Sequence, residues 1–418
     1  MTALLRGAFL RTRTSARLGA DFTKLWTASA VSNVGDGVTV VAGPLLVASL
    51  TRDPVLVAGA AFVQSLSCLL FSLVGGVLAD RLDRRRLIVV VDVVRAAALG
   101  GLCAALATGT VTIPLVYVVF SVLGACETIA DTAAVARLPA IVAPERLAAA
   151  NARLMATFTV GNQFVAKPLG AWLFAAAAAL PFGVDALSFV AASVLVAGMR
   201  SVPAGPRSRR SLRGEIAEGV RRLWSTPLLR CLALSMGTAN VAFCGAFAVF
   251  VLYARERLGL SGVGYGLLLT TFAVGGLAGT AVAGRLQTWF GATWVLRAGL
   301  GVEALTHLTL AITRRPWLAA AILVLFGVHT MVWGVIVTTL RQRAVPDRLL
   351  GRVAGVQTLL EVGGATLGML LGGVSAQSLG ITAPFWIACG LTVLIAAMAW
   401  GPLGEASVSA SGRVAHGK

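Results

Sequence analysis

The sequence predicts an all-α integral membrane protein with twelve transmembrane helices in two halves of six. Hydrophobic residues make up 57% of its 418 positions and charged residues only 12%, about half the charge of a typical soluble domain. Apolar segments of membrane-spanning length follow one another along most of the chain, and a single chain segment in lipid satisfies its backbone hydrogen bonds by forming a helix. Basic residues gather in alternate connections between these segments. Together these observations predict a helical multi-pass protein.

Each predicted span is long enough to cross about 30 Å of hydrocarbon. The first six spans are drawn at residues 25–50, 55–79, 87–108, 113–135, 151–177 and 181–200. The other six are drawn at residues 228–252, 263–284, 292–313, 316–340, 353–379 and 382–403. The resulting organisation is a basic arm at 1–24, halves at 25–200 and 228–404, a polar connection at 201–227 and a tail at 405–418. The arm lacks a signal-peptide pattern, so we interpret it as a basic cytoplasmic segment.

The distribution of Lys and Arg sets the predicted orientation. If the N-terminus lies inside the cell, 29 of the 35 basic residues fall on the cytoplasmic face, five on the opposite face, and one, Lys167, within a span. Cytoplasmic loops of membrane proteins carry such an excess. Both termini are therefore predicted to be cytoplasmic. The net charge of +18 follows from this orientation, and we expect no nucleic-acid partner.

Two short repeats support a division into equivalent halves. PERL, which begins at Pro144 after the fourth span, recurs as PDRL from Pro346 after the tenth, an offset of 202. Arg81-Leu82 after the second span recurs as Arg285-Leu286 after the eighth, an offset of 204. Duplicated halves with the same orientation place a binding site between them, near the middle of the bilayer.

The connection between the second and third spans carries a charged motif. It follows the pattern G-x-x-x-D-R-x-x-x-R-R, with Gly76, Asp80, Arg81, Arg85 and Arg86 at its fixed positions. In this motif, and over essentially its whole length, the chain resembles the major facilitator superfamily. Asp83 stands where that family usually has glycine. The context of Asp36, in GDG, and of Glu127, ahead of RLPAIVAPERLAAAN, is similar to that of macrolide-efflux and enterobactin-export proteins.

The resemblance implies the major facilitator fold and a gating role for the charged connection. Asp80 would contact the start of the eleventh span in one conformation only, because a carboxylate at a helix C-terminus needs a compensating positive partner. The alternative is that these charges only fix topology. Gly76 would let a neighbouring helix approach closely.

Ionisable residues inside spans are costly and therefore mark candidate functional positions. Asp36 lies between Gly35 and Gly37, which we interpret as weakening the helix and exposing backbone to a cavity; it carries a proton or contacts substrate, or it is a buried structural acceptor. Glu127 and Asp131 lie one turn apart on the fourth span, which suits a site that loads and unloads a proton.

Three further charges leave alternatives open. Asp131 could lie at the cytoplasmic mouth and pair with Arg137. Lys167 needs a wet cavity or a carboxylate, with Asp36, Glu127 or Glu361 as possible partners; it holds that carboxylate ionised, attracts an anionic substrate group, or forms a fixed bridge between helices. Glu361, in the eleventh span, is a cavity candidate.

Other charged residues are expected to be structural. Asp92 and Arg95, at i and i+3, are predicted to form a local ion pair. Glu303 and His307, at i and i+4, are predicted to form a satisfied structural pair, with a proton relay as the alternative. Asp185 is predicted to lie at the membrane interface.

Small residues predict close helix packing. Gly364, Gly368 and Gly372 form consecutive G-x-x-x-G steps in the eleventh span, and Gly275 and Gly279 form one in the eighth. In the fifth span, Gly161, Pro168 and Gly170 resemble the helix-bending antiporter motif of the family, although Ala166-Lys167 departs from it.

We interpret the chain as a secondary transporter of the bacterial inner membrane, a monomer that exports an amphiphilic small molecule such as an antibiotic, secondary metabolite or siderophore in exchange for protons. The direction of transport is implied by the family resemblance alone. The sequence shows no nucleotide-binding loop, nucleophile–His–acid set or metal cluster, so we expect neither an enzyme nor a cofactor. The alternatives are a flippase for lysophospholipid-like amphiphiles and a non-transporting sensor or scaffold.

Overall fold

The computed structural model describes residues 18–200 and 212–415. Within these ranges some residues are described by their backbone alone, among them Gly76, Asp80 and Arg81. Every regular element in the described part of the chain is a helix, as predicted. Ten of the described helices are long and apolar enough to cross a membrane.

The first half comprises α2 to α8. Its long helices are α2 (Ala20–Leu50), α3 (Pro54–Arg81), α4 (Arg84–Ala107), α5 (Ile113–Ile141) and α8 (Leu180–Ala197). Between α5 and α8 lie η1 (Pro144–Arg146), α6 (Leu147–Phe158), the π-helix η2 (Thr159–Val165) and α7 (Ala166–Ala176). Within the half, α2 packs on α8 and α7, α3 on α5, and α4 on α8 and α5.

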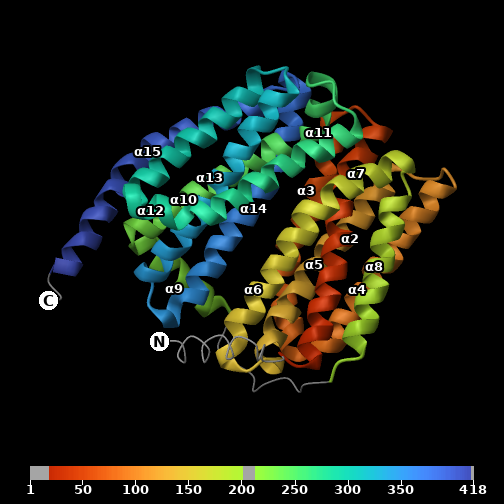
Figure 1. Ribbon diagram of the computed structural model, residues 1–418, viewed down its shortest axis with the longest axis horizontal. Coiled ribbons are helices and arrows are strands. Elements are labelled where there is room, and N and C mark those ends of the chain that lie inside the picture. Colours follow the sequence, from red (N-terminus) through yellow and green to blue (C-terminus); the bar gives the residue numbers. More distant parts are fainter. Residues whose placement is uncertain (1–17, 201–211, 416–418) are drawn as a thin grey trace, which may run out of the picture.

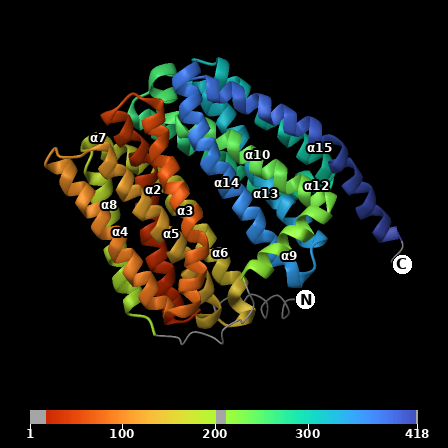
Figure 2. The same ribbon diagram turned by 180° about the vertical axis from the view of Figure 1, so that it is seen from behind.

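The second half follows the short amphipathic helix α9 (Leu212–Ser225). It comprises α10 (Pro227–Ala248), α11 (Phe250–Leu252), the π-helix η3 (Tyr253–Arg257), α12 (Gly262–Ile312), α13 (Pro316–Ala344), α14 (Asp347–Leu379) and α15 (Ala383–Ala415). In this half α10 packs on α14 and α15, and α12 on α13 and α15. The two halves stand side by side (Figures 1 and 2) and meet chiefly through α3 against α14 and α7 against α12.

The 51-residue helix α12 contains two of the predicted spans. At about 1.5 Å per residue it is more than twice the thickness of a hydrocarbon core. Gly291 breaks it with φ 76° and ψ 155°, a backbone conformation that only glycine adopts readily. The break falls in the connection predicted between residues 284 and 292. The total of twelve spans remains a prediction.

The N-terminus of α4 explains why Asp83 stands where the family motif usually has glycine. Asp83 is the N-cap of α4, and its carboxylate accepts hydrogen bonds from the backbone N–H groups of Arg85 and Arg86. Glycine has no side chain to make these bonds. Asp53 caps α3 in the same way, ahead of Pro54.

The predicted glycine packing is confirmed. Gly364, Gly368 and Gly372 on α14 face backbone carbonyls of α10, and a Cβ added at Gly372 would lie 2.0 Å from the Gly245 oxygen. On α12, a Cβ at Gly275 would lie 1.9 Å from the backbone oxygen of Val324 on α13. These helices approach so closely that neither position has room for a methyl group.

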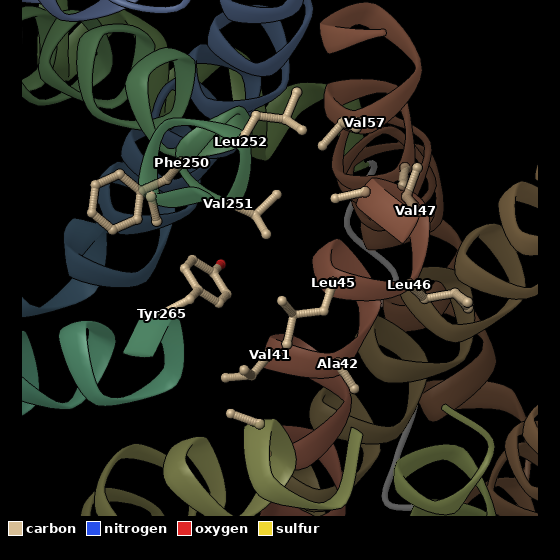
Figure 3. Packing of buried hydrophobic residues seen from close by; sticks show 14 of the residues in the cluster. Val41, Ala42, Leu45, Leu46, Val47, Val57, Phe250, Val251, Leu252 and Tyr265 are labelled. Atoms are coloured by element: carbon tan, nitrogen blue, oxygen red, sulfur yellow. The ribbon is translucent and has the colours of Figure 1, made fainter. Parts of the chain in front are cut away.

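One end of the bundle is closed by an apolar seal between the halves. We define this seal as Leu45 and Val57 of the first half with Val251, Leu252 and Tyr265 of the second. Figure 3 shows these side chains directed toward one another, and each is at most 4% exposed. Arg255 adds a polar link beside it, because its guanidinium donates to the backbone oxygen of Ala48 at 2.9 Å. We call the other end, which carries Lys24, Arg85 and Arg341, the basic end.

Candidate functional site

A cavity of about 1200 Å³ lies within the first half, along its face toward the second half. Phe247 and Ala248 of α10 are the second-half residues that line it in the described part of the chain. Toward the basic end its lining includes Val135 and Met155, which are 75% and 67% exposed. The cavity therefore opens at the basic end and stops at the apolar seal.

The cavity wall is largely apolar, with polar and charged side chains at separate places. The charged residues that line it are Asp36, Asp92, Arg95, Glu127, Asp131 and Lys167. The uncharged polar residues that line it are Ser29, Ser32, Asn33, Thr39, Gln64, Asn151, Asn162 and Gln163. Four of the five predicted cavity residues thus lie around one space: Asp36, Glu127, Asp131 and Lys167.

Asp36 and Arg95 form the ion pair of the cavity. A guanidinium nitrogen of Arg95 lies 2.9 Å from Asp36 Oδ1, and the guanidinium also stacks 3.9 Å from the centre of the Phe189 ring. The prediction that Arg95 pairs with Asp92 is wrong, because the long Arg95 side chain leaves its own helix and reaches α2 and α8. Stacking on an aromatic face gives that orientation an added attraction.

The glycines beside Asp36 have a different role from the one expected. Helix α2 is continuous through them, and both are buried. A Cβ at Gly35 would lie 2.2 Å from an Asp185 carboxylate oxygen, and one at Gly37 would lie 2.7 Å from the Asn162 backbone oxygen. The interpretation that they weaken the helix and expose backbone is wrong: they let α8 and η2 approach α2.

Asp185 is a buried residue that sequence reasoning misplaced at the interface. It is 1% exposed and accepts hydrogen bonds from Thr39 Oγ1 at 2.6 Å and Ser188 Oγ at 3.1 Å. These two hydroxyls satisfy the carboxylate inside the helix bundle. Ser188, one turn after Asp185, was the available signal; Thr39 is too distant in sequence to recognise.

Glu127 and Asp131 both line the cavity from α5. Glu127 is half-buried and Asp131 is exposed, and neither makes a hydrogen bond or ion pair within the described part of the chain. Arg137, the alternative partner of Asp131, instead donates to the Arg200 backbone oxygen at 2.6 Å. That pairing prediction is wrong, because Arg137 lies almost fully buried against the end of α8.

Lys167 is 8% exposed and has an uncharged partner. Its ammonium donates to Gln163 Oε1 at 2.5 Å and lies 6.0 Å from the centre of the Phe272 ring. Gln163 is one turn away, whereas Asp36 is already bound by Arg95. The carboxylate partner considered for Lys167 is therefore replaced by an amide, and the ammonium remains a wall group of the cavity.

Glu361 does not line this cavity. It accepts a hydrogen bond from Gln357 Nε2 at 2.8 Å, and Gln357 in turn accepts one from Arg341 at 2.9 Å. This chain of contacts connects α13 with α14. Glu361 is thus engaged within the second half.

In the second half, Glu303 has a different partner from the predicted His307. Glu303 Oε2 lies 3.6 Å from Nε2 of His329, on α13, and not beside His307. Both ring nitrogens of His307 lack a hydrogen-bond partner among the described residues, and its side chain is completely buried. The Glu303–His307 prediction is therefore wrong, because Glu303 pairs with the neighbouring helix.

The charged connection is only partly described. Gly76, Asp80 and Arg81 are described by their backbone alone, so the gate stays a prediction. Arg86 is exposed. Arg85 donates to the Met199 backbone oxygen at 2.8 Å, and Lys24 donates to that of Gly198. With Arg137, these cations satisfy the backbone carbonyls of residues 198–200, just after α8, a role that sequence reasoning missed.

The predicted helix-bending segment contains a π-helix. Gly161 lies within η2, and Pro168 follows in the first turn of α7. Proline has no N–H for the carbonyl four residues before it, which favours a wider turn at this point. A Cβ at Gly170 would lie 2.6 Å from the Val38 backbone oxygen, so α7 packs tightly on α2.

Comparison with solved structures shows a shared fold. The nucleoside transporter NupG has a TM-score of 0.72 at 10% identity, covering 92% of this chain and 98% of that one. A bacterial homologue of the iron transporter ferroportin in its inward-facing state has a TM-score of 0.72 at 16% identity, covering 91% and 98%. Its outward-facing state gives 0.61 at 17% identity, covering 93% and 99%.

Sequence comparison finds relatives that are named as exporters. The enterobactin exporter EntS of Citrobacter koseri is 27% identical over 365 residues, which is 85% of each chain. EntS of Salmonella typhimurium is 26% identical over 365 residues, 85% of this chain and 86% of that one. The family model described as transmembrane secretion effector matches residues 16–409. The chain therefore belongs to the transmembrane secretion effector family of the major facilitator superfamily, as a multi-pass transporter of the bacterial inner membrane.

Proposed function

We propose that the chain is a proton-driven exporter of an amphiphilic small molecule that works by alternating access. The single observation that carries the proposal is the cavity, which holds accessible charged groups, opens at the basic end and stops at the apolar seal. The positive-inside rule places the basic end in the cytoplasm, so the cavity loads from inside. Exporter relatives support the outward direction.

Glu127 and Asp131 are better candidates for proton exchange than Asp36. Asp36 is held by Arg95 at 2.9 Å, whereas the other two carboxylates meet the cavity without a cationic partner in the described part of the chain. A carboxylate in contact with cavity water can take up and release a proton as the access changes. Asp36 with Arg95 then joins α2 to α4 while the halves move.

Transport in everted membrane vesicles tests this proposal. Everted vesicles expose the basic end to the medium, so export appears as uptake. We expect uptake of fluorescent amphiphiles or a labelled siderophore to follow an imposed pH gradient, acid inside, and to stop with a protonophore. The Glu127→Gln variant should lose the gradient dependence. Glu256→Gln, on an exposed residue of η3, is the charge-matched control.

Two results would contradict the proposal. Uptake that ignores both the protonophore and the imposed gradient would remove proton coupling. Movement of labelled lysophospholipid between leaflets, without uptake of any soluble amphiphile, would favour a flippase.

A further inference from the structure

We propose that the cavity of the first half binds an amphiphilic cation, with Glu127 and Asp131 as the pair that takes its positive charge. The inference rests on the proposed export function and adds the sign of the substrate's charge. A molecule with an amine or quaternary centre on an apolar body has the required chemistry. The relatives' named cargo, enterobactin, is not assumed.

The charge balance of the cavity favours a cation. Of the two cationic side chains that line it, Arg95 is bound to Asp36, and Lys167 is bound to Gln163. The carboxylates of Glu127 and Asp131 have no such partner in the described part of the chain. An entering cation would therefore meet two carboxylates that are free to contact it.

The accessibility of the charged side chains also favours a cationic substrate. Asp131 is exposed and Glu127 half-buried, so both can be reached from the cavity. The Lys167 side chain is 8% exposed and its ammonium already has a hydrogen-bond acceptor. An anion would have to displace Gln163 to contact it. Burying an unpaired charge in an apolar site is costly, so the substrate's charge should be opposite to the accessible one.

The shape of the cavity requires an apolar body as well. Phe120, Phe158 and Phe247 line it from three different helices, together with many aliphatic side chains. Aromatic faces also attract cations. Its volume of about 1200 Å³ exceeds that of most drug-sized sites. A small hydrated cation would leave this wall unused, whereas an amphiphile would cover it.

The binding of two ions of similar shape and opposite charge tests the sign of the substrate's charge. The purified protein in lipid nanodiscs is titrated with radiolabelled tetraphenylphosphonium and, in separate samples, with radiolabelled tetraphenylborate, with empty nanodiscs as the blank for each ion. We expect saturable phosphonium binding, with tetraphenylborate at least about tenfold weaker. Replacing both residues, Glu127→Gln with Asp131→Asn, should weaken phosphonium binding by about tenfold or more, whereas Glu256→Gln should not change it.

Each other outcome would overturn the inference. Tighter borate binding that is lost in Lys167→Met would assign an anionic substrate to the ammonium. Equal affinity for both ions would show apolar partitioning without charge recognition. Unchanged phosphonium affinity in the double variant, with its unfolding temperature preserved, would remove the carboxylate pair. Because binding is measured without a proton gradient, failed proton-driven uptake with intact binding would reject the proposed function and leave this inference standing.

Discussion

Removing the Arg95 guanidinium should destabilise the protein by leaving the Asp36 carboxylate without its ion partner. At the observed 2.9 Å and an effective dielectric constant of about 20, the two charges attract by about 6 kcal/mol. Desolvation offsets much of this attraction, and breaking a fully buried pair costs about 3–5 kcal/mol. The Asp36 side chain is 27% exposed, so after Arg95→Met it can be hydrated by cavity water or take a proton. We expect a loss of about 2–3 kcal/mol.

A double-mutant cycle separates this ion pair from other effects of the substitution. The free energy of unfolding would be measured in mixed detergent micelles for Arg95→Met, Asp36→Asn and their combination. We expect a coupling of about 2 kcal/mol between the two positions. The parallel cycle with Asp92→Asn should give a smaller coupling, because the ion pair of Arg95 is with Asp36. A larger coupling to Asp92 than to Asp36 would refute the assignment.

Three further substitutions test packing and closure. Gly372→Ala, which forces a methyl group against α10, should lower the free energy of unfolding by about 1–3 kcal/mol, whereas Gly355→Ala, with nothing within 4 Å of its added Cβ, should not lower it. Arg255→Gln should loosen the apolar seal and increase the labelling of cysteines by a thiol reagent added from the outer side. Arg314→Gln, at an exposed residue, is the control and should not increase it. Equal labelling of the two variants would show that Arg255 does not help to close the seal. Arg137→Met should lower the free energy of unfolding by about 1–3 kcal/mol, since the backbone carbonyl of Arg200, just after α8, loses its donor. An unchanged denaturation midpoint would contradict this structural role.

Local patterns predicted what depends on neighbours in sequence. The helical class follows from apolar run length, and close helix packing at Gly364, Gly368 and Gly372 follows from their spacing, although the partner helix does not. Pairings between distant helices could not be predicted in this way. Arg95 had a carboxylate three residues away, yet its partner lies 59 positions away on α2. The Arg95 side chain is long enough to contact either carboxylate, and the packing of α4 on α8 determines which one it contacts.

Four charged members of the candidate site were predicted, whereas Asp92, Arg95 and the contacts within the site were not. A charged residue within an apolar run is visible because lipid makes it costly, and this identified Asp36, Glu127, Asp131 and Lys167. Glu361 was found by the same reasoning, but it contacts Gln357 in the second half. The cost of burial shows that a charge needs a partner; it does not show which one.

In the proposed orientation, the apolar seal also determines where the membrane voltage falls. Water in a cavity that opens to the cytoplasm would stay near the cytoplasmic potential, so most of the voltage would lie across the layer of Leu45, Val57 and their partners. A monovalent cation that passes outward through this layer works against an inside-negative potential, at about 2.3 kcal/mol per 100 mV. One entering proton returns the same charge. A one-for-one exchange would therefore respond to the pH gradient alone, whereas a second proton would let the voltage drive export.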